Sequence, residues 1–309
     1  MENNFTISVL ITYHNEGEML KEMLESLKLN IPPPDEILIF DDASDLPPED
    51  FIPKNMQVRI IKSEINVGPA SGRNRLLAET KCTFIHFHDS DDWFHPLWLA
   101  SVKNKLYLRN SDIVFNEISS SVNNKPSYQN FVTGFRFMLN KYDLMSIAIR
   151  YGLLVPSGTI RKTCVEKIMG FSVVFWQSED KDFYIRLLAS GVSYEVICDP
   201  LVCIRIRSGS RSKNLKEVWV DGLKVLESAK SYLPTKYFSD LAHAFSICGH
   251  HLFLLREYGY ASKSWQLCLE LGGSSCYWRS IGFRIVKALF GFRIAEETSL
   301  LYQRLKIRK

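Results

Sequence analysis

Apolar and polar positions follow two alternating periodicities over the first 115 residues. Short apolar runs rich in β-branched residues are typical of buried strands, and they occur at residues 6–12, 36–40, 58–61 and 83–87. Between them, apolar residues recur at helical spacing over 19–27 and 69–79. Strands that alternate with helices predict an α/β fold, in which right-handed crossovers build a mostly parallel central sheet flanked by helices.

The rest of the chain predicts a second block and a helical end. Residues 116–150 have weak periodicity, and the polar run at 119–129 predicts a surface loop. Further strand and helix patterns follow at 155–160, 163–169, 180–189, 194–197 and 201–206. Residues 213–309 have mainly helical periodicity, so we expect a C-terminal helical extension.

Composition narrows the class of protein. A chain of 309 residues with 46% hydrophobic and 23% charged residues is ordinary for a globular protein and argues against disorder. The net charge of +4 is too small to indicate a nucleic-acid binder. The charge is concentrated in residues 276–309, which hold eight basic and two acidic side chains, while the rest of the chain carries a net charge of −2.

The cysteines and the apolar runs predict a location. Seven cysteines without a CxxC pair indicate free thiols in a reducing compartment. The chain opens without the pattern of a signal peptide, and no apolar stretch reaches the 18 residues of a spanning helix. We expect a cytoplasmic protein, with peripheral contact to the inner face of a membrane left open for the basic C-terminal region.

Polar residues cluster where three of the predicted strands end. These clusters are 12–16, 41–45 and 89–92. Parallel sheets bind their ligands beyond the carboxyl ends of the strands, and a nucleotide is the typical ligand there. We therefore expect the three clusters to meet in one site.

The acidic cluster after the strand at 83–87 carries the sharpest chemical signal. Asp89, Asp91 and Asp92 lie within four residues and repel one another unless a cation or donor group neutralises them. Mg²⁺ and Mn²⁺ favour oxygen ligands and are often held by one or two carboxylates together with phosphate oxygens. The alternative is an acidic turn that caps the helix expected near Pro96.

The cluster at 41–45 permits two interpretations as well. A carboxylate of Asp41 or Asp42 could accept hydrogen bonds from a base or a ribose, or both could bond the backbone in a turn. The sequence holds neither GxGxxG nor GxxxxGK[ST], which argues against nicotinamide, flavin and P-loop chemistry.

Two histidines precede the acidic cluster on the same predicted strand. His86 and His88 could bind a transition metal in an HxHxD pattern, although strand histidines are more often structural.

Two further segments could contribute to a catalytic site. Glu179 and Asp180 begin a helix pattern and could supply a base, or they could merely complement the helix dipole. The Ser/Gly-rich segment at 205–212 contains Arg205, Arg207 and Arg211, which suit phosphate oxygens or form an ordinary solvated loop.

In this order and spacing, the motifs resemble the inverting glycosyltransferases of family 2, which have the GT-A fold of the nucleotide-diphospho-sugar transferases. The matching segments are SVLITYHNE at 8–16, IFDDASD at 39–45, NVGPASGRN at 66–74, HFHDSDDWFHP at 86–96, GTIRKTCVEKIMGFS at 158–172, SEDKDFYIRLLASG at 178–191 and RIRSGSRS at 205–212. The resemblance implies a GT-A catalytic domain over 1–212, with a nucleotide-sugar half at 1–115 and an acceptor and base half at 116–212. Residues 213–309 match none of these motifs.

The resemblance also implies roles for individual residues. The expected nucleotide contacts are Thr12, His14, Glu16, Asp42, Arg73 and Asp89. Asp89 and Asp91 form the DxD pair that holds Mn²⁺ or Mg²⁺, with Asp91 as the direct ligand, and Asp180 is the base with Glu179 beside it. Two departures matter: His14 stands where the family often has Tyr, and Arg207 replaces a His of the basic loop.

The expected reaction is transfer of a sugar from a nucleotide-diphosphate donor to an acceptor hydroxyl, with inversion. The acceptor would be a saccharide or a lipid-linked saccharide of surface polysaccharide synthesis. Two rivals stay open: a nucleotidyltransferase, which would usually have a Gly-rich basic loop after the first strand, and a non-catalytic protein that binds nucleotide sugars.

The last expectation concerns the C-terminal region. Ile281, Ile285, Leu289 and Phe292 recur at helical spacing with basic residues among them. Such a helix either lies in an anionic membrane interface or packs its apolar side on the protein.

Overall fold

The computed structural model describes residues 5–207, 214–273 and 281–307. The chain folds as two compact units. Unit 1 comprises Met1–Met145 and Leu153–Ser210, and unit 2 comprises Ser146–Gly152 and Arg211–Lys309. Each unit buries apolar side chains of its own.

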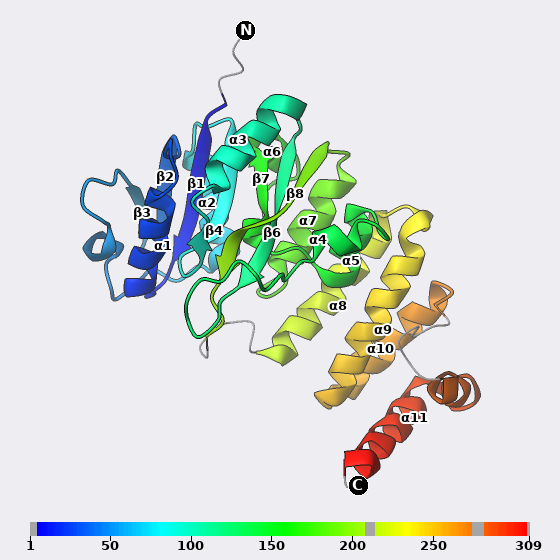
Figure 1. Cartoon of the computed structure of the whole chain (residues 1–309). Coiled ribbons are helices and arrows are strands. Elements are labelled where there is room, and N and C mark those ends of the chain that lie inside the picture. The colour runs from blue at the N-terminus through cyan, green and yellow to red at the C-terminus, as the bar shows by residue number, and fades with distance from the viewer. Residues whose placement is uncertain (1–4, 208–213, 274–280, 308–309) are drawn as a thin grey trace. The chain divides into compact units, whose positions relative to one another are not determined.

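Unit 1 is built on an eight-stranded mixed sheet (Figure 1). In spatial order the strands are β3 (Arg59–Ser63), β2 (Glu36–Asp42), β1 (Ile7–Tyr13), β4 (Phe84–Asp89), β7 (Gly158–Arg161), β6 (Ile113–Ser120), β8 (Tyr194–Ile204) and β5 (Trp93–Phe94). The pairs β3–β2, β2–β1, β1–β4 and β6–β8 are parallel, whereas β7 and β5 run antiparallel to their neighbours.

Helices flank this sheet (Figure 1). They are α1 (Glu18–Lys28), α2 (Pro69–Glu79), α3 (Trp98–Arg109), α4 (Phe135–Met138), α6 (Lys162–Lys167) and α7 (Glu179–Ala189), with 3-10 turns η1 (Pro48–Phe51) and η2 (Val155–Ser157). Strand β1 is buried nearly throughout because apolar residues of α1, α3 and β2 pack around it. A parallel strand that is covered on both faces has the near-continuous apolar run seen in the sequence.

Strand register brings the three predicted polar clusters together. Thr12 of β1 pairs with Asp89 of β4, and Tyr13 pairs with Asp41 of β2. The carboxyl ends of β1, β2 and β4 therefore meet at one edge of the sheet, as the sequence predicts.

Two strand predictions in the second block need correction. The patterns at 194–197 and 201–206 form one strand, β8, that continues through Pro200. Register shifts beside Glu117 place Pro200 at an irregularity, where its missing N–H does not interrupt the ladder. The pattern at 155–160 begins as the turn η2, and only Gly158–Arg161 pairs as β7.

The segment at 116–150 contains more structure than its periodicity predicts. Strand β6 extends to Ser120 and buries polar side chains, among them Asn116 and Glu117, which hide the apolar alternation. The buried carboxylate of Glu117 accepts hydrogen bonds from the backbone N–H groups of Thr133 and Phe135. These bonds hold the chain that leads into α4.

Unit 2 is helical, which confirms the predicted C-terminal extension. It contains most of α5 (Leu144–Tyr151), α8 (Leu215–Tyr232), the turn η4 (Thr235–Tyr237), α9 (Phe238–Leu254), α10 (Tyr258–Glu270) and α11 (Ile281–Ile307). Helix α9 packs against α8 and α10. Ser146 donates a 2.8 Å hydrogen bond to Asp240, and Arg150 pairs with the same carboxylate. Within the described parts of the chain, no helix is both long enough and apolar enough to cross a membrane.

Candidate active site

The acidic cluster lies where β4 ends, and arginine groups face all three of its carboxylates. Asp89 accepts a 2.8 Å bond from Arg73, and Asp91 forms a 2.6 Å ion pair with Arg207. Asp92 accepts a 2.8 Å hydrogen bond from the backbone N–H of Arg205. Burial, followed by the neighbouring carboxylates, raises the pKa of Asp91 and raises that of Asp92 much further. Burial is thus the main cause that disfavours the charged forms of Asp91 and Asp92, and repulsion between the carboxylates adds to it.

Arg73 of α2 bridges two segments that lie far apart in the sequence. Its side chain is buried, and its terminal nitrogens lie 2.8 Å from Asp89 and 2.9 Å from Glu179. The guanidinium thus joins the end of β4 to the start of α7. Arg73 was expected to contact the nucleotide; the structure directs both of its terminal nitrogens to carboxylates of the protein.

The candidate base stands in the first turn of α7. Burial, followed by the charge of Glu179, raises the pKa of Asp180 to about 7. Its Oδ1 accepts a 2.7 Å hydrogen bond from the backbone N–H of Lys181. A carboxylate with this pKa can hold or release a proton near neutral pH, as a general base must.

The candidates after β1 contact the neighbouring strand ends. Glu16 accepts a 2.6 Å hydrogen bond from the backbone N–H of His14 and lies 3.6 Å from Arg207. The imidazole of His14 donates from Nδ1 to the carbonyl oxygen of Asp42 at 2.8 Å. Burial raises the pKa of Glu16. With Thr12 paired to Asp89, the predicted residues of β1 lie against both acidic clusters.

Asp42 organises the entry of α2. Its two carboxylate oxygens accept hydrogen bonds from the backbone N–H groups of Val67 and Gly68, at 2.7 and 2.9 Å. Gly68 has a φ of 79° and lies against the ring of Trp176, so a larger residue there would meet both strain and the indole. The predicted contact between Asp42 and the nucleotide stays a prediction.

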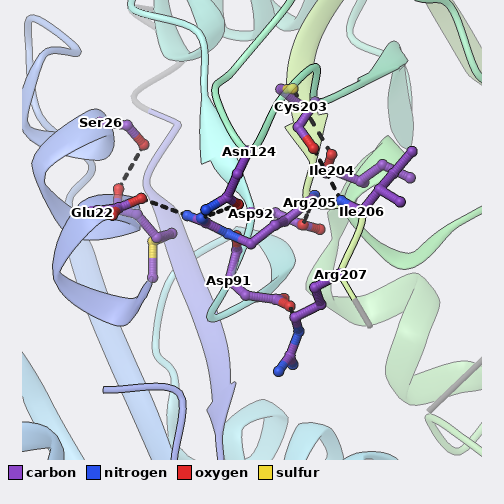
Figure 2. Close-up of polar contacts among 12 residues, drawn as sticks. Glu22, Ser26, Asp91, Asp92, Asn124, Cys203, Ile204, Arg205, Ile206 and Arg207 are labelled. Atoms are coloured by element: carbon purple, nitrogen blue, oxygen red, sulfur yellow. Dashed lines mark hydrogen bonds and ion pairs between the residues drawn. The ribbon is translucent and has the colours of Figure 1, made fainter. Parts of the chain in front are cut away.

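Two of the three loop arginines lie in the described part of the chain, and they differ in their contacts. Figure 2 shows the guanidinium of Arg205 between Glu22 and Asn124, at 2.6 and 2.8 Å. The same group lies 3.7 Å from the ring of Trp93. These contacts fix the guanidinium of Arg205 against side chains of the protein. Its predicted contact with the diphosphate stays a prediction. Arg207 faces Asp91, and Arg211 lies outside the described residues.

The strand histidines lie in the core of unit 1. His86 and His88 are buried, and the ring of His88 stacks on Phe94 with 3.8 Å between centroids. Burial lowers the pKa of His88 to about 4 and that of His86 well below its ordinary value. These contacts support the structural interpretation of both residues. Among the residues that the structure describes, no cluster of three or more His, Cys, Asp or Glu side chains forms a metal site.

One positioning residue was not singled out from the sequence. Asn74, next to Arg73, donates a 2.8 Å hydrogen bond to the carbonyl oxygen of Phe171 and accepts one from its N–H. This pair of bonds fixes the chain that leads into α7. In the sequence, the signal that points to Asn74 is its position directly after Arg73 in the segment NVGPASGRN.

Comparisons with known proteins find similarity to glycosyltransferases. The sequence profile of glycosyl transferase family 2 matches residues 8–158. The chain is 24% identical over 216 residues to an uncharacterized glycosyltransferase of Methanocaldococcus jannaschii, covering 67% of this chain and 72% of that protein. It is also 24% identical over 229 residues to the Escherichia coli UDP-Glc:alpha-D-GlcNAc-diphosphoundecaprenol beta-1,3-glucosyltransferase WfaP, covering 72% and 86%.

Solved structures agree on the fold. The crystal structure of Staphylococcus aureus TarS 1–349 in complex with UDP-GlcNAc matches with a TM-score of 0.68 at 17% identity, covering 96% of this chain and 92% of that one. The expected GT-A architecture is confirmed, as a mixed sheet flanked by helices.

Proposed function

Since residues 8–158 belong to glycosyl transferase family 2, we propose that this glycosyltransferase moves a sugar from a nucleoside-diphosphate donor to an acceptor hydroxyl with inversion at the anomeric carbon. One observation carries the proposal. Arg73 connects the strand-end carboxylate Asp89 to Glu179, whose neighbour Asp180 has a pKa of about 7. Arg73 and Glu179 thus connect the edge that we propose for the donor to the residue next to the proposed base.

The nucleoside would lie along the ends of β1 and β2. Thr12, His14, Glu16 and Asp42 offer it hydroxyl, imidazole and carboxylate groups. His14 can stack on a base, although its ring is smaller than that of Tyr. Arg207, together with Arg211 beyond the described residues, would bind the diphosphate, because guanidinium groups match phosphate oxygens with paired hydrogen bonds.

The donor set fits a divalent cation. Asp89 and Asp91 offer hard oxygen ligands, and their pairing with Arg73 and Arg207 indicates that this position accepts positive charge. When bound, Mn²⁺ or Mg²⁺ would neutralise charge on the departing diphosphate. With only two such carboxylates, the diphosphate itself would have to complete the coordination shell.

Asp180 would act as the base. It takes the proton of the acceptor hydroxyl while that oxygen bonds to the anomeric carbon on the face opposite the diphosphate. The bond between that carbon and the diphosphate oxygen breaks, and the nucleoside diphosphate leaves. Single displacement of this kind inverts the configuration.

The acceptor class follows from a relative and is therefore part of the proposal. The name of WfaP gives it a diphosphoundecaprenol-linked acceptor. For this chain we propose a saccharide or lipid-linked saccharide, which would place the reaction in surface glycan synthesis.

Substitution of the base tests the proposal. Asp180→Asn should lower turnover about 10²–10⁴-fold while donor binding persists, because the amide cannot accept the proton. Asp182→Asn is the matched control: Asp182 lies on the same helix but pairs with Arg186, so turnover should persist even if stability falls.

A panel of nucleotide sugars with Mn²⁺, screened by thermal shift and then by product analysis, identifies the donor. Release of nucleoside diphosphate supports the glycosyl transfer. Release of pyrophosphate would favour a nucleotidyltransferase, and full turnover by Asp180→Asn would refute the assigned base.

A further inference from the structure

Helix α11 of unit 2 exposes large apolar side chains. Ile285, Leu289, Phe290, Ile294 and Leu301 are between 45% and 69% exposed. Apolar residues that gather on one exposed helix mark a surface that contacts another molecule more often than isolated ones do. We call these five residues the α11 apolar surface.

The same helix is anchored to unit 2 by other residues. Phe292 is buried and stacks on Trp265, with 5.1 Å between centroids. Glu296 is buried and lies 2.9 Å from Nδ1 of His250 on α9. The helical spacing in the sequence predicts Phe292 on the same apolar stripe as Ile285 and Leu289. In the structure Phe292 is buried, whereas Ile285 and Leu289 are exposed. The anchoring contacts are therefore made without the α11 apolar surface, which stays exposed.

Basic residues lie among these apolar positions. Residues 281–307 hold five basic and two acidic side chains. One of the acidic ones, Glu296, is turned into unit 2, so it offsets the exposed positive charge less than its formal charge suggests. Arg284 is exposed between the apolar positions, and Arg293 is 70% exposed and pairs with Glu297 at 3.1 Å.

The backbone limits how this helix could meet a membrane. Gly291, with a φ of 82°, interrupts the helix and leaves segments of about ten and sixteen residues. Each is shorter than the ~20 residues that a spanning helix needs. Short helical segments that expose apolar side chains with cations among them suit the plane of a bilayer interface.

We propose that the α11 apolar surface docks on an anionic lipid bilayer. The apolar side chains enter the boundary between headgroups and acyl chains, and the cations contact lipid phosphates. A second copy of the chain fits less well, because a two-fold interface would bring the same cations together. The proposal goes beyond sugar transfer and does not depend on it.

Vesicle sedimentation of the full chain tests the proposal. We expect binding to vesicles of equimolar phosphatidylcholine and phosphatidylglycerol, and much weaker binding to phosphatidylcholine alone. The double variant Leu289→Ser/Phe290→Ser should lose about 10- to 100-fold in partition, because two large apolar groups no longer leave water. Arg284→Gln should lose about fivefold, and the wild-type binding should weaken as salt rises.

The matched control is Leu269→Ser on α10. Leu269 is 56% exposed in the same unit but lies outside the α11 apolar surface, so its partition should equal that of the wild type. Equal thermal unfolding of all variants shows that the fold is kept. The proposal is overturned if the wild type ignores anionic vesicles or if the double variant binds them unchanged. A wild-type dimer that the double variant dissociates, without vesicle binding, would assign the surface to a second copy.

Discussion

The carboxylates at the end of β4 receive positive charge from two regions of unit 1, helix α2 and the segment after β8. Arg73 of α2 is 2% exposed and pairs with Asp89 and Glu179. The side chain of Arg207 is 33% exposed and pairs with Asp91. The ion pairs of both arginines are short, so the two arginines differ mainly in how far water can reach each guanidinium.

Exposure decides what each arginine can do. A buried charge is stable only with its partners, so Arg73 is committed to two carboxylates. The guanidinium of Arg207 keeps part of its contact with water, so leaving Asp91 should cost Arg207 less than leaving its two carboxylates would cost Arg73. We therefore expect Arg73 to hold the site together and Arg207 to respond to a donor.

The largest expected effect comes from removing the buried charge. Arg73→Met should lower the free energy of unfolding by about 3 kcal/mol, because the buried carboxylate of Glu179 loses its guanidinium partner, whereas Asp89 is 39% exposed and can be solvated by water. Urea unfolding at pH 8 measures the loss.

A second substitution sharpens this prediction. Adding Glu179→Gln to Arg73→Met should recover part of the loss, because the buried carboxylate that lacks its partner is then removed. A loss below 1 kcal/mol at pH 8 would show that Arg73 and Arg207 do not differ as described.

Local sequence pattern was sufficient for the fold of the N-terminal half. Buried parallel strands such as β1 have apolar runs, and the polar residues that follow them mark the edge of the sheet. The pattern failed where polar side chains are buried, as at Asn116 and Glu117, because burial there depends on partners such as the N–H of Thr133. The two strand patterns on either side of Pro200 likewise form one strand in the structure. The strand continues there because a register irregularity accommodates the missing N–H of the proline.

The sequence put forward residues that the structure places together, but it did not predict the bonds between them. Residue type and position put forward Asp89 and Glu179, and the family resemblance added Arg73. That Arg73 joins the other two depends on how α2 packs, across a separation of 106 residues for Glu179. The different contacts of Arg205 and Arg207 likewise depend on tertiary packing, which no local pattern encodes.

The next effect concerns the pH dependence that this network gives to Asp180. Its pKa is raised to about 7, and a base must be ionised, so kcat/KM should rise about tenfold per pH unit up to pH 7 and level off above it. Glu179→Gln should move the midpoint down, because the charge of Glu179 is the second cause of the raised pKa. A flat profile between pH 5 and 8, or an upward shift in the variant, would contradict this account.

The smallest expected change in stability belongs to Arg207. Arg207→Gln removes an ion pair whose guanidinium is 33% exposed, so the free energy of unfolding should fall by less than it does for Arg73→Met. The effect of Arg207→Gln should appear instead in donor binding. The dissociation constant of a nucleoside diphosphate should rise, because one phosphate contact is gone. For the same reason, the dissociation constant should depend less on salt. Arg207→Lys should restore part of the affinity through charge but not the paired hydrogen bonds of a guanidinium. Isothermal titration of the three proteins at low and moderate salt separates these contributions. If Arg207→Gln destabilises the fold as much as Arg73→Met while leaving donor affinity unchanged, both arginines are structural, and the segment after β8 has no part in binding the diphosphate.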